Sequence, residues 1–320
     1  MDDIIIVGPG RMCVGIAVAL VQYDYSVTIV DTKHRNPGEE GISLKKAERD
    51  IRFNLELLNK LGRIKKPLDS MMSKIRTRSG LGDGPLPARF IFETLPEDPE
   101  IKKMFYAGLG NFLDDNTNTV VASATSTISL DLFQEQFAKP ENLIIAHWLN
   151  PAFIIPLVEV AINDKTSQSA INITMELLRK AGKTPVLCKN SPGFIVPRIQ
   201  TAAMNEAVRI YEENVASVED IDIAIKKGFG FRLSVLGLIE FIDLGGVDIL
   251  YFAGMYLSKT LGQPQFIPPL STKEKMDKNE IGPKTGKGYY NYEGVDMDVL
   301  LEEKYRAFFK MLDLVNKEKE

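Results

Sequence analysis

The chain has 320 residues, of which 44% are hydrophobic and 26% charged, and a formal net charge of -4, which is typical of a globular protein with a substantial core. The acidic balance disfavours a binder of nucleic acid or of anionic membranes, and no stretch approaches the roughly 18 apolar residues of a membrane span. Its two cysteines, Cys13 and Cys188, stand among apolar neighbours, so we expect no disulfide framework and no metal site. The N-terminus lacks the pattern of a signal peptide, which predicts a cytoplasmic protein.

Short apolar runs recur through the first half of the chain, each of strand length and rich in β-branched residues. They cover residues 4–8, 27–31, 89–95, 119–125 and 142–148. A helix-like stretch separates the first two runs, and this alternation predicts a parallel sheet buried on both faces. The charged stretch 43–62 has helical spacing and predicts a long amphipathic excursion from the sheet.

The character of the sequence changes near residue 188, where KNSPGF forms a turn-rich joint. Helical patterns with little strand signal follow; Gly228 is expected to close one helix, and residues 297–320 to form another. We therefore predict an α/β Rossmann domain over residues 1–188, doubly wound around a mostly parallel sheet. An all-α domain follows over residues 189–320.

Gly8-Pro9-Gly10 lies between the first strand and the helix that follows, and Asp31 ends the second strand. This order is typical of a dinucleotide site: Gly8 permits the tight turn, Gly10 lets the pyrophosphate approach, and Asp31 reaches the ribose 2′-OH. A carboxylate there favours NAD over NADP, although Lys33 and Arg35 follow closely. Cys13 replaces the third glycine of the motif, which serves packing, so a plain strand–helix turn stays an alternative.

The two histidines differ in context. His34 lies in a polar loop and is expected to be solvated. His147 ends an apolar strand, and Glu159 follows inside the apolar run PLVEV, where an unpaired carboxylate is costly. A His–Glu pair would orient the imidazole as a general base, whereas a structural histidine is the alternative.

Six motifs in order resemble the 3-hydroxyacyl-CoA dehydrogenase family over nearly the whole chain: GPGRMCVGIA, ETLPEDPEIK, ATSTIS, HWLNP with PLVEV, SPGFIV, and GPKTGKGYY. The resemblance implies a Rossmann domain with a helical hairpin insertion and a helical second domain that usually mediates dimerisation. It also implies hydride transfer from a secondary alcohol to NAD.

The resemblance implies a role for each matching residue. Toward NAD it implies contacts from Gly8, Gly10, Asp31, Glu97, Lys102, Asn150 and Lys284. It implies that Ser126 binds the substrate oxygen, that His147 accepts the hydroxyl proton, and that Glu159 orients His147. The pattern itself leaves simpler interpretations open: a solvated helix start for Glu97 and Lys102, a local hydrogen bond to the backbone for Ser126, and plain turn chemistry for Lys284.

Departures from the family concern the substrate. Pro197 stands where thioester-active members have an asparagine that binds the substrate oxygen, and Pro156 where acyl-CoA members commonly have lysine. Segment 228–248 is longer than in short acyl-CoA members and resembles dehydrogenases of free acids such as gulonate, carnitine and pyridine carboxylates. These often carry a basic residue where Arg232 stands, although Arg232 could equally be a helix-end cation. Trp148, beside His147, could narrow the pocket.

The sequence thus predicts an NAD-dependent dehydrogenase of fatty acid metabolism that oxidises the 3-hydroxyl of a short 3-hydroxyacyl-CoA to the 3-oxo form. Two alternatives stay open: a dehydrogenase of a small free hydroxy acid, and a non-catalytic NAD-binding protein. An imine or ketone reductase of related fold is a third. The expected partners are a small-molecule substrate and a second copy of the chain, bound through residues 190–320, with neither nucleic acid nor membrane.

Overall fold

The computed structural model describes residues 4–33, 41–113 and 118–317, which divide into two compact units, Met1–Met204 and Asn205–Glu320. The predicted domain boundary, between residues 188 and 189, falls at the end of β8 (Thr184–Lys189) and stays a prediction. No helix in the described ranges is both long enough and apolar enough to cross a membrane.

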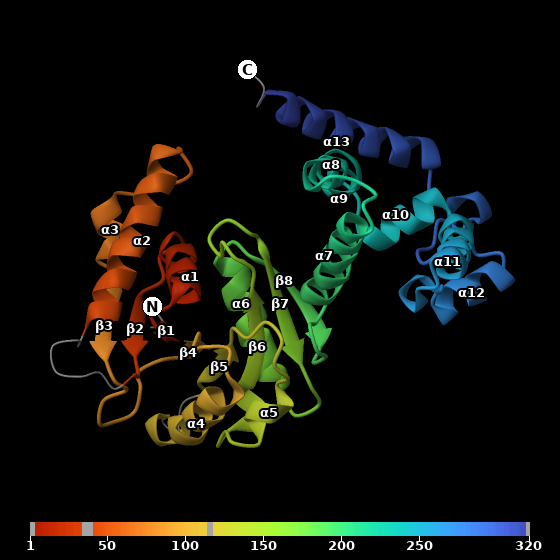
Figure 1. Ribbon diagram of the computed structural model, residues 1–320. Coiled ribbons are helices and arrows are strands. Elements are labelled where there is room, and N and C mark those ends of the chain that lie inside the picture. The colour runs from red at the N-terminus through yellow and green to blue at the C-terminus, as the bar shows by residue number, and fades with distance from the viewer. Residues whose placement is uncertain (1–3, 34–40, 114–117, 318–320) are drawn as a thin grey trace. The chain divides into compact units, whose positions relative to one another are not determined.

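The first unit is built on one sheet with the strand order β3-β2-β1-β4-β5-β6-β7-β8 (Figure 1). Its other strands are β1 (Ile4–Val7), β2 (Val27–Asp31), β3 (Ile75–Ser79), β4 (Phe90–Glu93), β5 (Val120–Ser123), β6 (Leu143–Trp148) and β7 (Leu157–Ile162). All neighbours pair in parallel except β6 and β7, which are antiparallel. The predicted doubly wound, mostly parallel sheet is confirmed, and the sequence missed β3, β7 and β8.

Helices cover both faces of this sheet, as the alternation of side chains along a strand requires. They are α1 (Arg11–Val21), α2 (Ile42–Lys60), α4 (Pro99–Leu109), α5 (Asp131–Gln134) and α6 (Gln168–Lys180). The short α3 (Leu68–Met72) packs against α2, and α7 (Val196–Glu212) follows β8 and begins in this unit. On β1, Ile4 and Ile6 pack in one core with α1, α2 and α6, whereas Ile5 and Val7 pack in another with α4 and α5. The predicted amphipathic excursion is α2, whose buried residues follow helical spacing.

The second unit is helical, as predicted. It contains α8 (Val218–Ala224), α9 (Gly230–Leu233), α10 (Leu238–Gly245), α11 (Val247–Leu261), α12 (Leu270–Asp277) and α13 (Met297–Lys317). The expectation that Gly228 closes a helix is wrong. A π-helical turn over Ile225–Phe229 carries the chain from α8 directly into α9, so Gly228 lies inside a continuous helical segment.

The carboxyl ends of β1, β2, β4, β5 and β6 share one edge of the sheet, because these strands run parallel. Ligands of doubly wound folds bind at this edge. The topology thereby gathers there the GPG turn, Asp31, the segment after β4, the segment after β5 and His147.

Candidate active site

A cleft of about 890 Å³ lies over the β1–α1 turn. It is lined by Gly8, Pro9, Gly10, Arg11, Met12, Asp31, Thr32, Lys33, Ser43, Leu81, Thr94, Leu95, Pro96, Ile101, Met104, Phe105, Gly108 and Phe112. Of the residues predicted to hold a dinucleotide, Gly8, Gly10 and Asp31 meet here. Asp31 is largely buried at the end of β2. His34 and Arg35 lie outside the described residues.

The two glycines of the turn have different surroundings. Gly8 has φ +99°, and a Cβ there would lie 2.9 Å from the carbonyl oxygen of Thr94. Gly10 has no atom within 4 Å of where its Cβ would stand, so its bare backbone faces open space at the start of α1. A pyrophosphate fits such a place, beside free N–H groups and the positive end of a helix dipole.

Cys13 does not damage this turn. Its side chain is fully buried in the core, and burial raises the pKa of the thiol. The close approach occurs two positions further on, between α1 and the turn that follows β6: a Cβ on Gly15 would lie 3.0 Å from the Cβ of Ala152. Gly15 therefore provides the tight packing that the third glycine of the motif usually provides.

Alanine at the two glycines should have opposite effects. Gly8→Ala places a Cβ against the Thr94 carbonyl at positive φ and should lower the free energy of unfolding by at least about 1–2 kcal/mol. Gly10→Ala enters open space and should leave stability within about 0.5 kcal/mol. It should nevertheless raise the Kd for NADH at least about tenfold, because the methyl group fills the phosphate approach. Thermal unfolding and NADH titration check both; equal destabilisation would contradict this assignment.

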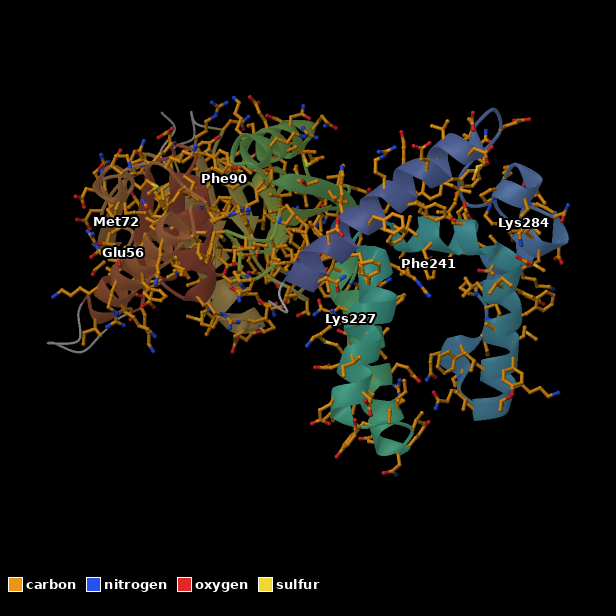
Figure 2. The ribbon with its side chains drawn as sticks, turned by 90° about the horizontal axis from the view of Figure 1, so that it is seen from above. Glu56, Met72, Phe90, Lys227, Phe241 and Lys284 are labelled. Atoms are coloured by element: carbon orange, nitrogen blue, oxygen red, sulfur yellow. The ribbon has the colours of Figure 1, made fainter. Side chains whose placement is uncertain are left out.

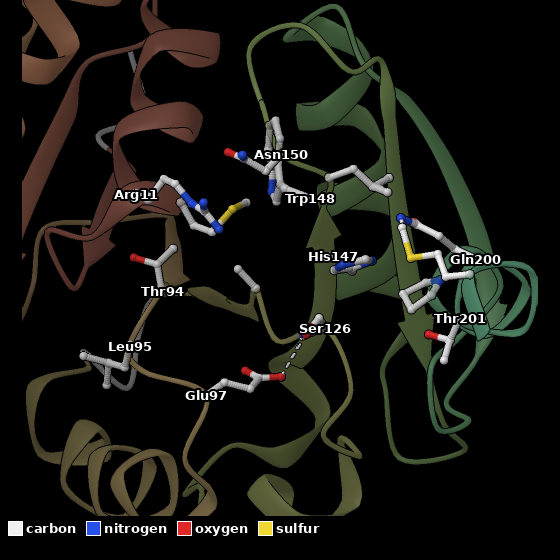
Figure 3. Close-up of a pocket in the computed structure, with 15 residues that line it drawn as sticks. Arg11, Thr94, Leu95, Glu97, Ser126, His147, Trp148, Asn150, Gln200 and Thr201 are labelled. Atoms are coloured by element: carbon white, nitrogen blue, oxygen red, sulfur yellow. Dashed lines mark hydrogen bonds between the residues drawn. The ribbon is translucent and has the colours of Figure 1, made fainter. Parts of the chain in front are cut away.

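A second cavity, of about 600 Å³, adjoins the cleft (Figure 3). It is lined by Arg11, Met12, Thr94, Leu95, Glu97, Ala124, Ser126, His147, Trp148, Leu149, Asn150, Pro197, Gln200, Thr201 and Met204. Arg11, Met12, Thr94 and Leu95 line both spaces, so the cavity and the cleft are continuous. A dinucleotide lying in the cleft can thus present its far end to the cavity.

His147 and Glu159 form the predicted pair. They stand directly opposite each other in the antiparallel β6–β7 register, which explains their spacing in the sequence. The Nδ1 atom of His147 lies 2.7 Å from Oε2 of Glu159, and both residues are buried. Because Nδ1 is engaged, Nε2 is the ring nitrogen left for a ligand in the cavity.

The SPGFIV motif holds the other oxygen of this carboxylate. The backbone N–H groups of Ile195 and Val196, at the start of α7, donate to Oε1 of Glu159 over 2.9 and 2.8 Å. Two amide donors and a helix N-terminus stabilise a buried anion. Glu159 is therefore held in place and fixes both the orientation and the tautomer of His147.

Glu97 organises the loop that carries Ser126. Its Oε1 accepts hydrogen bonds from Oγ1 of Thr125 (2.5 Å), the N–H of Ser126 (2.9 Å) and the N–H of Thr127 (3.2 Å). Burial alone would raise the pKa of Glu97, but the Thr125 hydroxyl, the nearby Lys102 charge and the two amides outweigh it and lower the pKa. Glu97 and Ser126 both line the cavity, as the prediction requires.

Lys102 is not at a solvated helix start, so that alternative is wrong. Its side chain is 1% exposed, and Nζ lies 2.7 Å from Oε1 of Glu93 and 3.7 Å from Oε2 of Glu97. Glu93, which the sequence analysis missed, also accepts hydrogen bonds from Tyr106 and Ser123. Lys102 lines neither the cleft nor the cavity. Through its ion pair with Glu97 it supports the loop that carries Ser126.

Asn150, Trp148 and Pro197 also line the cavity. Asn150 is exposed, whereas Trp148 is 2% exposed and packs edge-on against Phe92. Nζ of Lys183 lies 5.5 Å from the centroid of the Trp148 ring, and burial lowers the pKa of Lys183 to about 8. Pro197, in the first turn of α7, contributes no donor.

Two predicted residues belong to the second unit. Lys284 is exposed on the turn after α12 (Figure 2). Arg232 is exposed on α9, with its guanidinium carbon 5.3 Å from the centroid of the Phe241 ring. Contacts of either residue with NAD or with substrate stay predictions.

The GPKTGKGYY motif wraps a buried carboxylate. Asp243 is 1% exposed and accepts hydrogen bonds from the N–H groups of Tyr289 (2.9 Å) and Tyr290 (2.7 Å). A Cβ on Gly282 or Gly288 would collide with Asp243, so these glycines are required by packing. The motif therefore has a structural role within the second unit.

Sequence reasoning missed four polar residues of the cavity: Arg11, Thr94, Gln200 and Thr201. Arg11 and Thr94 could have been found from the sequence. Arg11 directly follows the GPG turn, and Thr94 directly follows the last residue of β4. Gln200 and Thr201 lie one turn beyond Pro197 on the same face of α7. Nothing in their local sequence distinguishes them from other exposed helical residues.

Comparison with known proteins agrees with this geometry. The family 3-hydroxyacyl-CoA dehydrogenase, NAD binding domain, matches residues 3–191, and the family 3-hydroxyacyl-CoA dehydrogenase, C-terminal domain, matches residues 193–292. The chain is 28% identical over 305 residues to 5-formyl-3-hydroxy-2-methylpyridine 4-carboxylate 5-dehydrogenase of Mesorhizobium japonicum, covering 95% of each chain. It is also 28% identical over 299 residues to human mitochondrial hydroxyacyl-coenzyme A dehydrogenase, covering 91% of each.

Comparison with solved structures indicates the same family. The 3-hydroxyacyl-CoA dehydrogenase of Archaeoglobus fulgidus superposes with a TM-score of 0.75 at 28% identity, covering 98% of this chain and all of the other. The family matches confirm NAD as the cofactor. The chain therefore belongs to the 3-hydroxyacyl-CoA dehydrogenase family and is an NAD-dependent oxidoreductase.

Proposed function

We propose that this enzyme oxidises the 3-hydroxyl of a short 3-hydroxyacyl substrate to the 3-oxo form, with His147 as the general base. The observation that carries the proposal is the buried His147–Glu159 pair, which opens onto a cavity continuous with the nucleotide cleft. A base oriented by a carboxylate beside a hydride acceptor is what oxidation of a secondary alcohol needs.

The residues divide the work as follows. NAD, when bound, supplies the hydride acceptor; Gly8, Gly10 and Asp31 hold its adenosine and diphosphate side. Nε2 of His147 accepts the hydroxyl proton as the C–H bond breaks, so the alcohol loses a proton and a hydride and becomes a ketone. Glu159 stabilises the imidazolium that forms.

The hydroxyl group of Ser126 donates a hydrogen bond to the same substrate oxygen, and Glu97 holds the loop that contains Ser126. Asn150, which lines the cavity, contacts the cofactor. We also assign NAD contacts to Glu97 and, from the second unit, to Lys284. The NAD contact expected of Lys102 is not kept, because Lys102 is buried against Glu93 and lines neither the cleft nor the cavity. A homodimer formed through residues 190–320, a cytoplasmic location and a role in fatty acid metabolism complete the proposal.

The acyl group has two candidate forms. A coenzyme A thioester accords with the name of the human relative, and a free acid with that of the Mesorhizobium japonicum relative. Pro197 lines the cavity, and a proline side chain cannot donate a hydrogen bond to a thioester oxygen. This observation is the reason for keeping the free acid as a second candidate beside the thioester.

The test is NADH formation by the purified protein on matched substrates: 3-hydroxybutyryl-CoA and longer thioesters beside free 3-hydroxybutyrate, carnitine and sugar acids. We expect turnover on at least one 3-hydroxy compound and none on matched amines, which an imine reductase would accept. Tight NADH binding without turnover on any of these compounds would contradict the proposal and favour a non-catalytic NAD-binding protein.

A further inference from the structure

The loop that carries Ser126 is held at both of its ends. Glu97 binds the first part, residues 125–127, as described above. The last part, residues 129–131, which leads into α5, is bound by the side chain of Asn190. Asn190 lines neither the cleft nor the cavity, so it acts on the site only through this loop and through its own neighbours in the chain.

The amide group of Asn190 makes three hydrogen bonds to this loop. Its Oδ1 accepts from the N–H of Leu130 over 3.0 Å, and its Nδ2 donates to Oγ of Ser129 and to Oδ2 of Asp131, each over 2.9 Å. The backbone N–H of Leu130 can only donate and the carboxylate of Asp131 can only accept, so the two ends of the amide are not interchangeable. The side chain is thereby fixed in orientation as well as in position.

Asn190 also belongs to the segment that holds Glu159. It directly follows β8, and its own N–H donates to the carbonyl oxygen of Ile162, the last residue of β7, over 2.6 Å. A short turn later, the N–H groups of Ile195 and Val196 donate to Oε1 of Glu159. One residue therefore connects the loop of the substrate-binding serine with the segment that holds the carboxylate of the base.

The turn between Asn190 and α7 is hydrogen-bonded within itself. The N–H of Phe194 donates to the carbonyl oxygen of Ser191 over 2.9 Å, and the guanidinium of Arg198 donates to Oγ of Ser191 over 2.7 Å. Phe194 is buried, and the centroid of its ring lies 5.7 Å from that of the His147 ring. A displacement of Asn190 is therefore transmitted to the surroundings of His147, because the turn has little freedom to absorb it.

We propose that Asn190 is a positioning residue for the reaction, which fixes Ser126 relative to the His147–Glu159 pair so that both groups meet the same substrate oxygen. This inference rests on the proposed function, in which Ser126 donates to the oxygen whose proton His147 accepts. The two groups come from different segments, the loop after β5 and the end of β6. Their separation must match one oxygen atom, and hydride transfer tolerates little error in that geometry.

Three variants test this position. Asn190→Ala removes all three hydrogen bonds to the loop. Asn190→Asp keeps an acceptor for the N–H of Leu130 but places a carboxylate oxygen against Asp131, where like charges repel. The double variant Asp131→Asn/Asn190→Asp exchanges donor and acceptor and restores the pair. Asn163, whose Nδ2 donates to Oδ1 of Asp131 over 2.5 Å, can donate equally to the oxygen of the new amide.

We expect Asn190→Ala and Asn190→Asp each to lower kcat on the best 3-hydroxy substrate by about 10- to 100-fold, the effect of displacing a group by roughly 1 Å. KM for the substrate and the Kd for NADH should change less than about threefold, because the loss falls on the transition state. The double variant should recover kcat to within about threefold of the wild type. A residue that only stabilised the fold would lower the melting temperature and leave kcat unchanged.

Asn163→Ala is the matched control from the same polar cluster. It removes hydrogen bonds to Asp131 and Gln134, but Asn163 contacts neither Ser129 nor Leu130 among the described residues, so kcat should stay at the wild-type value. Thermal unfolding shows which variants are folded. If Asn190→Ala does not fold, the comparison of Asn190→Asp with the double variant carries the test.

Amide hydrogen exchange gives a readout that does not depend on turnover. In Asn190→Asp the amides of residues 126–130 and those of Ile195 and Val196 should exchange faster than in the wild type, and the double variant should restore their protection. A wild-type enzyme that turns over no 3-hydroxy compound would sink the proposed function. The exchange measurement would then still test whether Asn190 connects the two segments.

Three results would overturn the proposal. One is a folded Asn190→Ala variant whose kcat lies within about threefold of the wild type. Another is a double variant as impaired as Asn190→Asp, because the exchanged pair keeps the geometry of the original. The third is an equal loss of kcat in Asn163→Ala, which would show a general loosening of this end of the sheet.

Discussion

Replacing His147 with glutamine is expected to lower kcat by about 100- to 10,000-fold, the contribution of a well-placed general base. The amide cannot accept the hydroxyl proton, whereas the remaining parts of the site, the nucleotide cleft and the Ser126 loop, stay in place. KM for NAD should change little, because His147 lines the cavity and not the cleft.

The measurement is steady-state NADH formation on the best substrate of the panel, with NADH titration and thermal unfolding as checks on folding. Retained NADH binding shows that the lost activity is chemical rather than structural. Turnover within a few-fold of the parent enzyme would mean that another group takes the proton.

Replacing Glu159 with glutamine should lower kcat by about 100- to 10,000-fold with the fold intact. The two backbone N–H groups of Ile195 and Val196 require an acceptor, so the glutamine oxygen faces them. Its NH₂ group is then directed at Nδ1 of His147. Nδ1 must become the acceptor, Nε2 carries the proton, and the histidine can no longer serve as a base.

A second variant tests the role of the two amides separately. Glu159→Ala removes the acceptor for the two amides as well, so it should lower the melting temperature, whereas Glu159→Gln should not. Glu176→Gln, an exposed glutamate on α6 of the same unit, is the matched control with unchanged kcat. Equal melting temperatures for Glu159→Ala and the wild type would contradict the role given to the amides.

Much of the fold could be predicted from the sequence, because the central parallel strands are buried on both faces and read as continuous apolar runs. The strands that were missed lack that signal. β3 (IRTRS) and β8 (TPVLCK) are edge strands in which no residue is fully buried. β7 contains Glu159. The sequence analysis noted the apolar residues around Glu159 but did not assign a strand to them.

The same limit applies to the site. His147, Glu159, Ser126 and the glycines were found because their neighbours in the chain form motifs. Arg11, Thr94, Gln200 and Thr201 were missed, because they come together around the cavity only once distant segments of the chain pack. Whether a polar group has a partner depends on residues distant in sequence.

The sequence by itself determined the central parallel strands, the glycine turn after the first strand and the pairing of His147 with Glu159. These depend on local periodicity and short spacing. Only the tertiary structure decided that Lys102 is buried against Glu93, that the SPGFIV motif donates two amides to Glu159, and that Gly15 replaces the third glycine. The physical reason is that hydrogen-bond partners and close packing are set by which strands become neighbours, and local patterns carry no information about that.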